Sequence, residues 1–176
     1  MQNIRQLEAL YFKLRFDYSD DLAWASCVDW AVERLGLDEE GDDLEIVLLA
    51  SARNIDEVVP LVEVIVARYL GGDRLDDQLA AGKYIVALRQ AYLEGRETVH
   101  SIDIKLTQLY PKLGYPEWLG MLSRNCEYAT DVPAFEDPFE KEFSYISALW
   151  AESDNRVEFA ERYDPKTSQG HDFNPA

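Results

Sequence analysis

The chain has 176 residues, of which 47% are hydrophobic and 12% aromatic, a composition typical of a globular protein with a buried core. Its 34 acidic residues outnumber 17 basic ones, giving a net charge of −17 at pH 7, which disfavours nucleic acid and anionic membranes as ligands and favours a basic partner. No apolar run approaches a membrane span, and we expect no signal peptide, no cofactor and a cytoplasmic location.

Helical spacing of apolar residues dominates the chain, and no stretch alternates as a β-strand would. The spacing predicts a first helix from about Asn3 to Phe16 and a second from about Tyr18 to Leu35, which Gly36 is expected to end. The pair Asp42-Asp43 is a typical helix start, so a third helix is expected to begin at Leu44.

Helix signals continue through the second half. Residues Asn54 to Glu57 have the types of a capping box, which predicts a fourth helix that ends at Gly71-Gly72. A long fifth helix over about 75–94 is apolar on nearly every side and is expected to be central. The remaining predictions are a helix from Val99 to Tyr110, a short helix opened by Pro116, an irregular stretch over 123–136, and a last long helix capped by Asp137 that ends near Arg162. The expected buried face of that last helix is Phe139, Phe143, Ile146 and Trp150.

These elements predict an all-α fold. We expect a single-domain bundle or stack of about seven helices over residues 1–163, followed by a flexible C-terminal tail over 164–176. A stack of helical hairpins is the competing topology, although no internal repeat is evident.

No arrangement of catalytic or metal-binding residues is evident. Glu97 and His100 have the spacing of a di-iron motif, but the required second copy is missing, so a helix start with a surface histidine is favoured. Cys126 has a neighbouring Arg124 that could lower the pKa of its thiol, yet no histidine lies near it in sequence. Cys27 is expected in the core. We therefore expect no catalytic residue and no metal site.

Acidic residues are densest between Asp17 and Glu45, where 11 of them accompany a single base, Arg34. One interpretation is a solvated surface that keeps the protein soluble. The other is a landing site for a positively charged protein. The stretch 38–43 lacks the ligand spacing of a calcium loop, so we expect no calcium site there.

Trp30 is predicted to lie on the outward face of the second helix, together with Ser26, Asp29, Glu33 and Arg34. An aromatic side chain among acids is typical of a binding hot spot. The alternative, with equal weight, is that the first helix or the C-terminal part of the chain covers Trp30. The opposite face, which is expected to be buried, consists of Trp24, Val28, Ala31, Val32 and Leu35.

Three short motifs carry a resemblance to a known family. The segments Gly114-Tyr115-Pro116-Glu117-Trp118-Leu119, Leu48-Leu49-Ala50-Ser51 and Glu57-Val58 resemble a family of uncharacterised small acidic bacterial helical proteins. Those proteins are similar to the immunity partners encoded beside polymorphic or contact-dependent toxins. The resemblance covers roughly Cys27 to Tyr128, and the stretch Arg124 to Tyr128 departs from the family pattern. It implies a protein that acts by binding.

Charge and resemblance together predict a cytoplasmic immunity protein that occludes the active site of a basic, nuclease-type toxin domain. The alternative is a helical adaptor or regulatory protein that acts by protein binding or homodimerisation. The expected contact residues are Asp17, Asp20, Asp21, Asp29, Trp30 and Glu33, with Asp38, Glu39, Glu40, Asp42 and Asp43 as a flanking steering patch.

Overall fold

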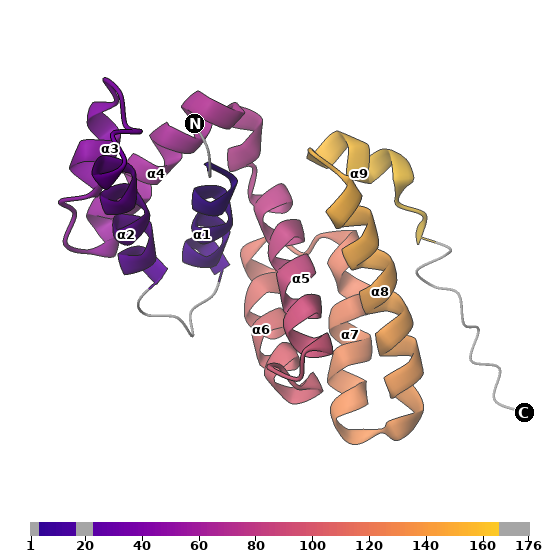
Figure 1. Cartoon of the computed structure of the whole chain (residues 1–176). Coiled ribbons are helices and arrows are strands. Elements are labelled where there is room, and N and C mark those ends of the chain that lie inside the picture. The colour runs from indigo at the N-terminus through magenta and orange to yellow at the C-terminus, as the bar shows by residue number, and fades with distance from the viewer. Residues whose placement is uncertain (1–3, 17–22, 166–176) are drawn as a thin grey trace, which may run out of the picture. The chain divides into compact units, whose positions relative to one another are not determined.

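A computed structural model of the chain describes residues 4–16 and 23–165 (Figure 1). These residues contain nine α-helices, two short 3-10 helices and no β-strand, so the predicted all-α fold class is confirmed. Contacts cluster into two compact units, Met1–Asp76 and Asp77–Ala176.

The expected domain boundaries stay predictions. The single domain over 1–163 is not tested by the clustering of contacts, and the expected tail from residue 166 onward lies outside the described residues. Among the described helices, none is both long and apolar enough to cross a membrane.

The first unit consists of α1 (Ile4–Phe16), α2 (Ala23–Gly36), α3 (Leu44–Leu49), α4 (Ile55–Leu70) and the 3-10 helix η1 (Gly72–Leu75). Helix α1 packs against α2 and α4, and the short α3 packs against the same two helices. The largest fully buried side chains of this core are Trp30, Tyr11, Leu7, Ile46, Leu49 and Ile65. A buried ion pair between Glu8 of α1 and Arg74 of η1 joins the first helix of the unit to its last.

Two helix starts in this unit follow the predicted signals. The Asp43 carboxylate accepts a hydrogen bond from the backbone N–H of Glu45 (3.1 Å) and caps α3. The Asn54 side chain accepts one from the backbone N–H of Glu57 (3.0 Å) and caps α4. The Glu57 carboxylate accepts from the backbone N–H of Arg53 (2.9 Å), so the predicted capping box closes one residue earlier than expected. Both helices begin where the sequence predicts.

The end of α2 differs from the prediction. Gly36 is the last helical residue, but the left-handed conformation that ends the helix is at Asp38, whose φ is 53°. The N–H of Glu39 donates to the C=O of Arg34 (3.0 Å) and the N–H of Asp38 to that of Leu35 (3.2 Å), which is the pattern of a Schellman motif. Aspartate tolerates this conformation better than most residues do. The chain therefore leaves α2 in a fixed direction.

The second unit consists of α5 (Asp77–Leu93), α6 (Val99–Lys112), α7 (Glu117–Asp131), η2 (Pro133–Phe135), α8 (Glu136–Glu152) and α9 (Arg156–Arg162). Helices α5 to α8 form a bundle in which α8 packs against α5 and α7, and α6 packs against α5 and α7 (Figure 1). Helix α9 packs against α8. The predicted buried face of the last long helix is confirmed, since Phe139, Phe143, Ile146 and Trp150 are all fully buried.

Three predictions for this unit are wrong. Residues 123–131, which the pattern left irregular, belong to α7, because Cys126 and Ala129 extend its buried face with side chains too small to stand out. The expected cap at Asp137 lies inside the first turn of α8, where no side chain caps the helix. The last long helix stops at Glu152, and Asn155 caps the separate α9.

Candidate functional site

Trp30 is only 2% exposed, so the prediction that it anchors a partner at the surface is wrong and the alternative that it is covered is confirmed. The buried face of α2 consists of Ala23, Cys27, Trp30, Ala31 and Arg34. Val32, which the apolar pattern placed inside, is 51% exposed. The buried face of α2 is therefore rotated relative to the predicted one. Arg34, which the apolar pattern placed on the solvent side, belongs to the buried face.

Arg34 can occupy the buried face because acidic neighbours neutralise its charge. Its side chain is 2% exposed and forms ion pairs with Glu33 (2.9 Å) and Glu39 (2.6 Å). Its guanidinium also lies 6.0 Å from the centroid of the Trp30 ring, within the range of a cation–π contact. Glu33 and Glu39, both predicted contact residues, therefore form ion pairs with a buried arginine of the same unit.

Asp43 is also engaged internally. It is 6% exposed, its carboxylate pairs with Arg68 (2.6 Å), and it accepts a hydrogen bond from the hydroxyl of Tyr69 (2.8 Å). Burial opposes ionisation of this carboxyl, but the hydrogen bonds from Tyr69 and Arg68 outweigh it and hold the pKa of Asp43 below its ordinary value. Arg68 also pairs with Glu45 (2.8 Å). Asp43 is thus largely buried and internally paired, and its predicted role in contacting a partner stays a prediction.

The other predicted carboxylates divide into three groups. Asp29, Asp38 and Asp42 are exposed, and among the described residues they have no ion-pair partner. Glu40 is half-buried, and its Oε2 atom lacks a hydrogen-bond partner in the same part of the chain. The predicted contacts that fall on residues Asp17, Asp20 and Asp21 lie outside the described residues.

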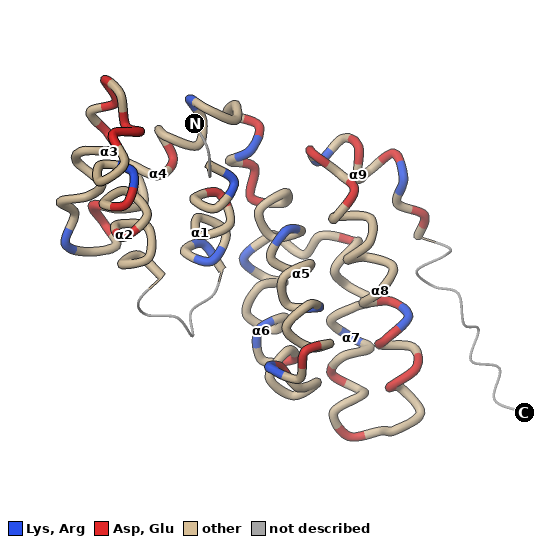
Figure 2. Tube along the Cα trace, in the orientation of Figure 1, with Lys and Arg blue, Asp and Glu red and all other residues tan. Residues whose placement is uncertain are grey.

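The loop between α2 and α3, here called the acidic loop (residues 38–43), borders a shallow hollow of about 450 Å³. Arg68 and Tyr69 of α4 form the other side of the hollow. Figure 2 shows acidic residues gathered along this loop. The sequence thus identified the acidic segment, and the structure distinguishes its exposed, unpaired members from those that hold Arg34 and Arg68.

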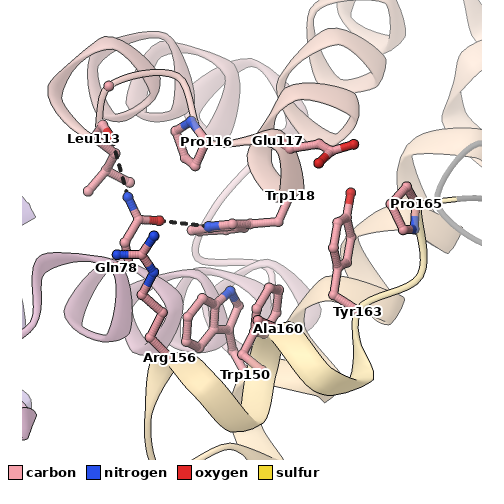
Figure 3. Close-up of a pocket in the computed structure, with 12 residues that line it drawn as sticks. Gln78, Leu113, Pro116, Glu117, Trp118, Trp150, Arg156, Ala160, Tyr163 and Pro165 are labelled. Carbon is pink, nitrogen blue, oxygen red and sulfur yellow. Dashed lines mark hydrogen bonds between the residues drawn. The ribbon is translucent and has the colours of Figure 1, made fainter.

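A second hollow, of about 540 Å³, lies in the second unit between the start of α7, the end of α8 and α9 (Figure 3). Its walls include four aromatic side chains, Trp118, Trp150, Phe159 and Tyr163. The Trp150 and Phe159 rings stack with centroids 3.8 Å apart, and Trp118 meets Trp150 edge to face at 5.2 Å. We call this the aromatic pocket. No sequence prediction pointed to it, because its residues are scattered along the chain.

The polar groups of the aromatic pocket are largely occupied. The indole N–H of Trp118 donates to Gln78 (2.8 Å), and the side-chain N–H of Gln78 donates to the carbonyl of Leu113 (3.2 Å) (Figure 3). The indole nitrogen of Trp150 is buried, has no hydrogen-bond acceptor among the described residues, and points toward the ring of Trp118 (Figure 3). This orientation suits an N–H···π contact within the wall. Arg156 is exposed at the rim.

Cysteine and metal chemistry receive no support from the geometry. Cys27 and Cys126 are fully buried, and burial raises the pKa of each thiol to about 12, contrary to the lowering considered for Cys126. Glu97 accepts a hydrogen bond from Ser101 (2.5 Å) and pairs with Lys105. Among the described residues, no group of three or more histidines, cysteines and acids is placed to hold a metal ion.

Comparison of the chain with models of known protein families, with curated proteins and with solved structures gives no match.

Proposed function

We propose that this protein is an immunity protein, which binds a cognate basic toxin domain of the nuclease type in the cytoplasm and covers its active site. One observation carries the proposal. Asp29, Asp38 and Asp42 are exposed without an ion-pair partner in the described part of the chain. They belong to a unit in which 17 acidic residues accompany 7 basic ones.

The chemistry of nucleases explains why such a surface can inhibit. An enzyme that cleaves nucleic acid needs cationic side chains where it holds the phosphates. Carboxylates on the surface of a helical unit compete for those cations and exclude the substrate without any chemical step. Long-range attraction also raises the association rate, which matters when a toxin must be stopped before it acts.

The test is an affinity purification from the cells that make the protein, with the full chain as bait. A variant with Asp29→Lys, Asp38→Lys and Asp42→Lys serves as the matched bait. We expect the wild type to retain a basic protein that stops growth when it is expressed alone, and co-expression of the wild type should restore growth. The proposal fails if the retained protein is harmless, or if the triple variant restores growth as well as the wild type does.

The alternative proposal is a helical adaptor or regulatory protein whose acidity only keeps it soluble and is not a binding site. The observation that favours it is the internal use of Glu33, Glu39 and Asp43 to hold Arg34 and Arg68. An adaptor that acts by homodimerisation has a mass in solution twice that of the chain. Light scattering after size-exclusion chromatography measures this mass, and a monomer at micromolar concentration contradicts the homodimer.

A further inference from the structure

Three apolar side chains of α3 are exposed although the helix packs against α2 and α4. Leu44, Val47 and Leu48 are 62%, 43% and 46% exposed, whereas Ile46 and Leu49 are fully buried. Residues three and four positions apart share one face of a helix, so the exposed side chains form one stripe. We call it the α3 stripe (Leu44, Val47 and Leu48). Single exposed leucines are ordinary, but three apolar side chains on one short helix make an apolar spot.

Carboxylates lie at one end of the α3 stripe. The acidic loop leads directly into α3, and its exposed, unpaired Asp42 precedes Leu44 by two residues. Figure 2 shows the acidic residues of this loop beside α3. Asp43 and Glu45 are engaged with Arg68 instead, so they do not project from the stripe as unpaired charges. An apolar centre with a charged rim is the usual composition of a protein interface.

We propose that the α3 stripe and the exposed carboxylates of the acidic loop form a docking surface for a cationic protein surface that carries apolar side chains at its centre. This inference rests on the proposed function and assigns the apolar anchor role that the buried Trp30 cannot fill. The acids set the encounter rate and the orientation of the partner, and the apolar contact sets the lifetime of the complex.

Charge decides which occupant fits this surface. A second copy of the chain, with its own net charge of −17, brings Asp38 and Asp42 against the same carboxylates of its partner. An anionic lipid surface is repelled for the same reason. A basic protein instead places lysine and arginine side chains against these aspartates while its apolar side chains cover the α3 stripe.

The experiment uses two labelled peptides of leucine and lysine, each of roughly 18 residues, or about five helical turns. The amphipathic peptide carries all its leucines on one helical face, and the dispersed peptide has the same composition with its leucines spread evenly. Fluorescence anisotropy measures the Kd of each for the full chain. The test variant is Leu44→Gln/Val47→Gln/Leu48→Gln, and Leu44→Gln alone alters only the most exposed member. The control is Ile104→Gln/Val157→Gln, which removes side chains that are 48% and 65% exposed elsewhere.

The expected result is that the wild type binds the amphipathic peptide at least tenfold more tightly than the dispersed one. The triple variant should lose this preference, Leu44→Gln should reduce it about threefold, and the control should keep it. Circular dichroism confirms that each variant stays helical. The inference is overturned if the wild type shows no preference, or if the triple variant and Leu44→Gln both keep it.

Failure of the proposed function has a different signature. The proposed function fails if the wild type binds neither peptide at low salt. It also fails if Asp29→Lys/Asp38→Lys/Asp42→Lys binds both peptides as tightly as the wild type does. A wild type that binds both peptides equally tightly, in a salt-sensitive manner, overturns the docking surface alone.

Discussion

Gly82 of α5 faces the indole ring of Trp150 on α8, and the two helices approach too closely for a methyl group. A Cβ atom built on Gly82 would lie 2.0 Å from Cδ2 of Trp150 and 2.5 Å from Cε2 and Cε3. The ring cannot move aside, because it is fully buried, stacks on Phe159 at 3.8 Å and meets Trp118 at 5.2 Å. Replacement of Gly82 by alanine therefore forces the helices apart.

The expected loss follows from two opposed terms. Alanine improves helix propensity by about 1 kcal/mol over glycine. Overpacking of a well-filled core costs about 1–3 kcal/mol and occasionally more, and a contact this short belongs at the upper end. We expect Gly82→Ala to lower the free energy of unfolding by about 2 kcal/mol, which corresponds to a fall in Tm of roughly 4–8 °C. Thermal unfolding followed by circular dichroism and tryptophan fluorescence measures both.

Two other glycines provide matched controls. Nothing lies within 4 Å of a Cβ on Gly36 at the end of α2, so Gly36→Ala should stabilise the protein by about 0.5–1 kcal/mol. A Cβ on Gly120 would meet only the end of the Tyr110 side chain, with the hydroxyl oxygen at 3.0 Å and Cζ at 3.6 Å, so Gly120→Ala should be nearly neutral. The close packing of Gly82 on α5 against Trp150 on α8 is refuted if Gly82→Ala is as stable as the wild type, or if its free energy of unfolding exceeds that of Gly36→Ala.

Three further outcomes are expected. Because the pKa of Asp43 is lowered in the folded state, its carboxylate stabilises the fold above about pH 4, and this stabilisation is lost as the pH falls. Asp43→Asn should therefore lower the free energy of unfolding, measured by urea titration, by about 1–2 kcal/mol at pH 7 and by less at pH 3. Arg34→Met should lower the free energy of unfolding by about 1–2 kcal/mol, because it removes the charge-assisted contacts that Arg34 makes with Glu33 and Glu39; an unchanged urea midpoint contradicts this. Cys27 and Cys126, whose thiols have a pKa of about 12, should react with a thiol reagent at pH 7.5 only after unfolding, and rapid labelling of the native protein excludes the buried placement.

The sequence predicts the helices well where capping chemistry and large apolar side chains coincide. Asp43 and Asn54 cap α3 and α4 as expected, and the apolar repeat from Phe139 to Trp150 identifies the buried face of α8. Prediction fails where the buried side chains are small. Cys126 and Ala129 contribute little to an apolar pattern, so the second half of α7 was missed.

The candidate site is harder to predict because an ion pair changes which side of a helix is buried. A helical wheel treats Arg34 as a surface residue and rotates Trp30 outward with it. In the fold, Glu33 and Glu39 neutralise Arg34, which then shares the buried face with Trp30. The sequence also does not predict that the α3 stripe is exposed. Apolar residues occur on both sides of this short helix, and their pattern does not indicate which side the neighbouring helices cover.

We propose that the exposed carboxylates of the first unit attract a basic protein partner. This is tested by the association rate constant with the basic protein that the wild type retains, measured by stopped-flow fluorescence between low and physiological salt. We expect the wild-type rate constant to fall about tenfold or more over this range, and Asp29→Lys/Asp38→Lys/Asp42→Lys to associate more slowly with a weaker salt dependence. Equal rates and equal salt dependence for the two proteins would contradict it.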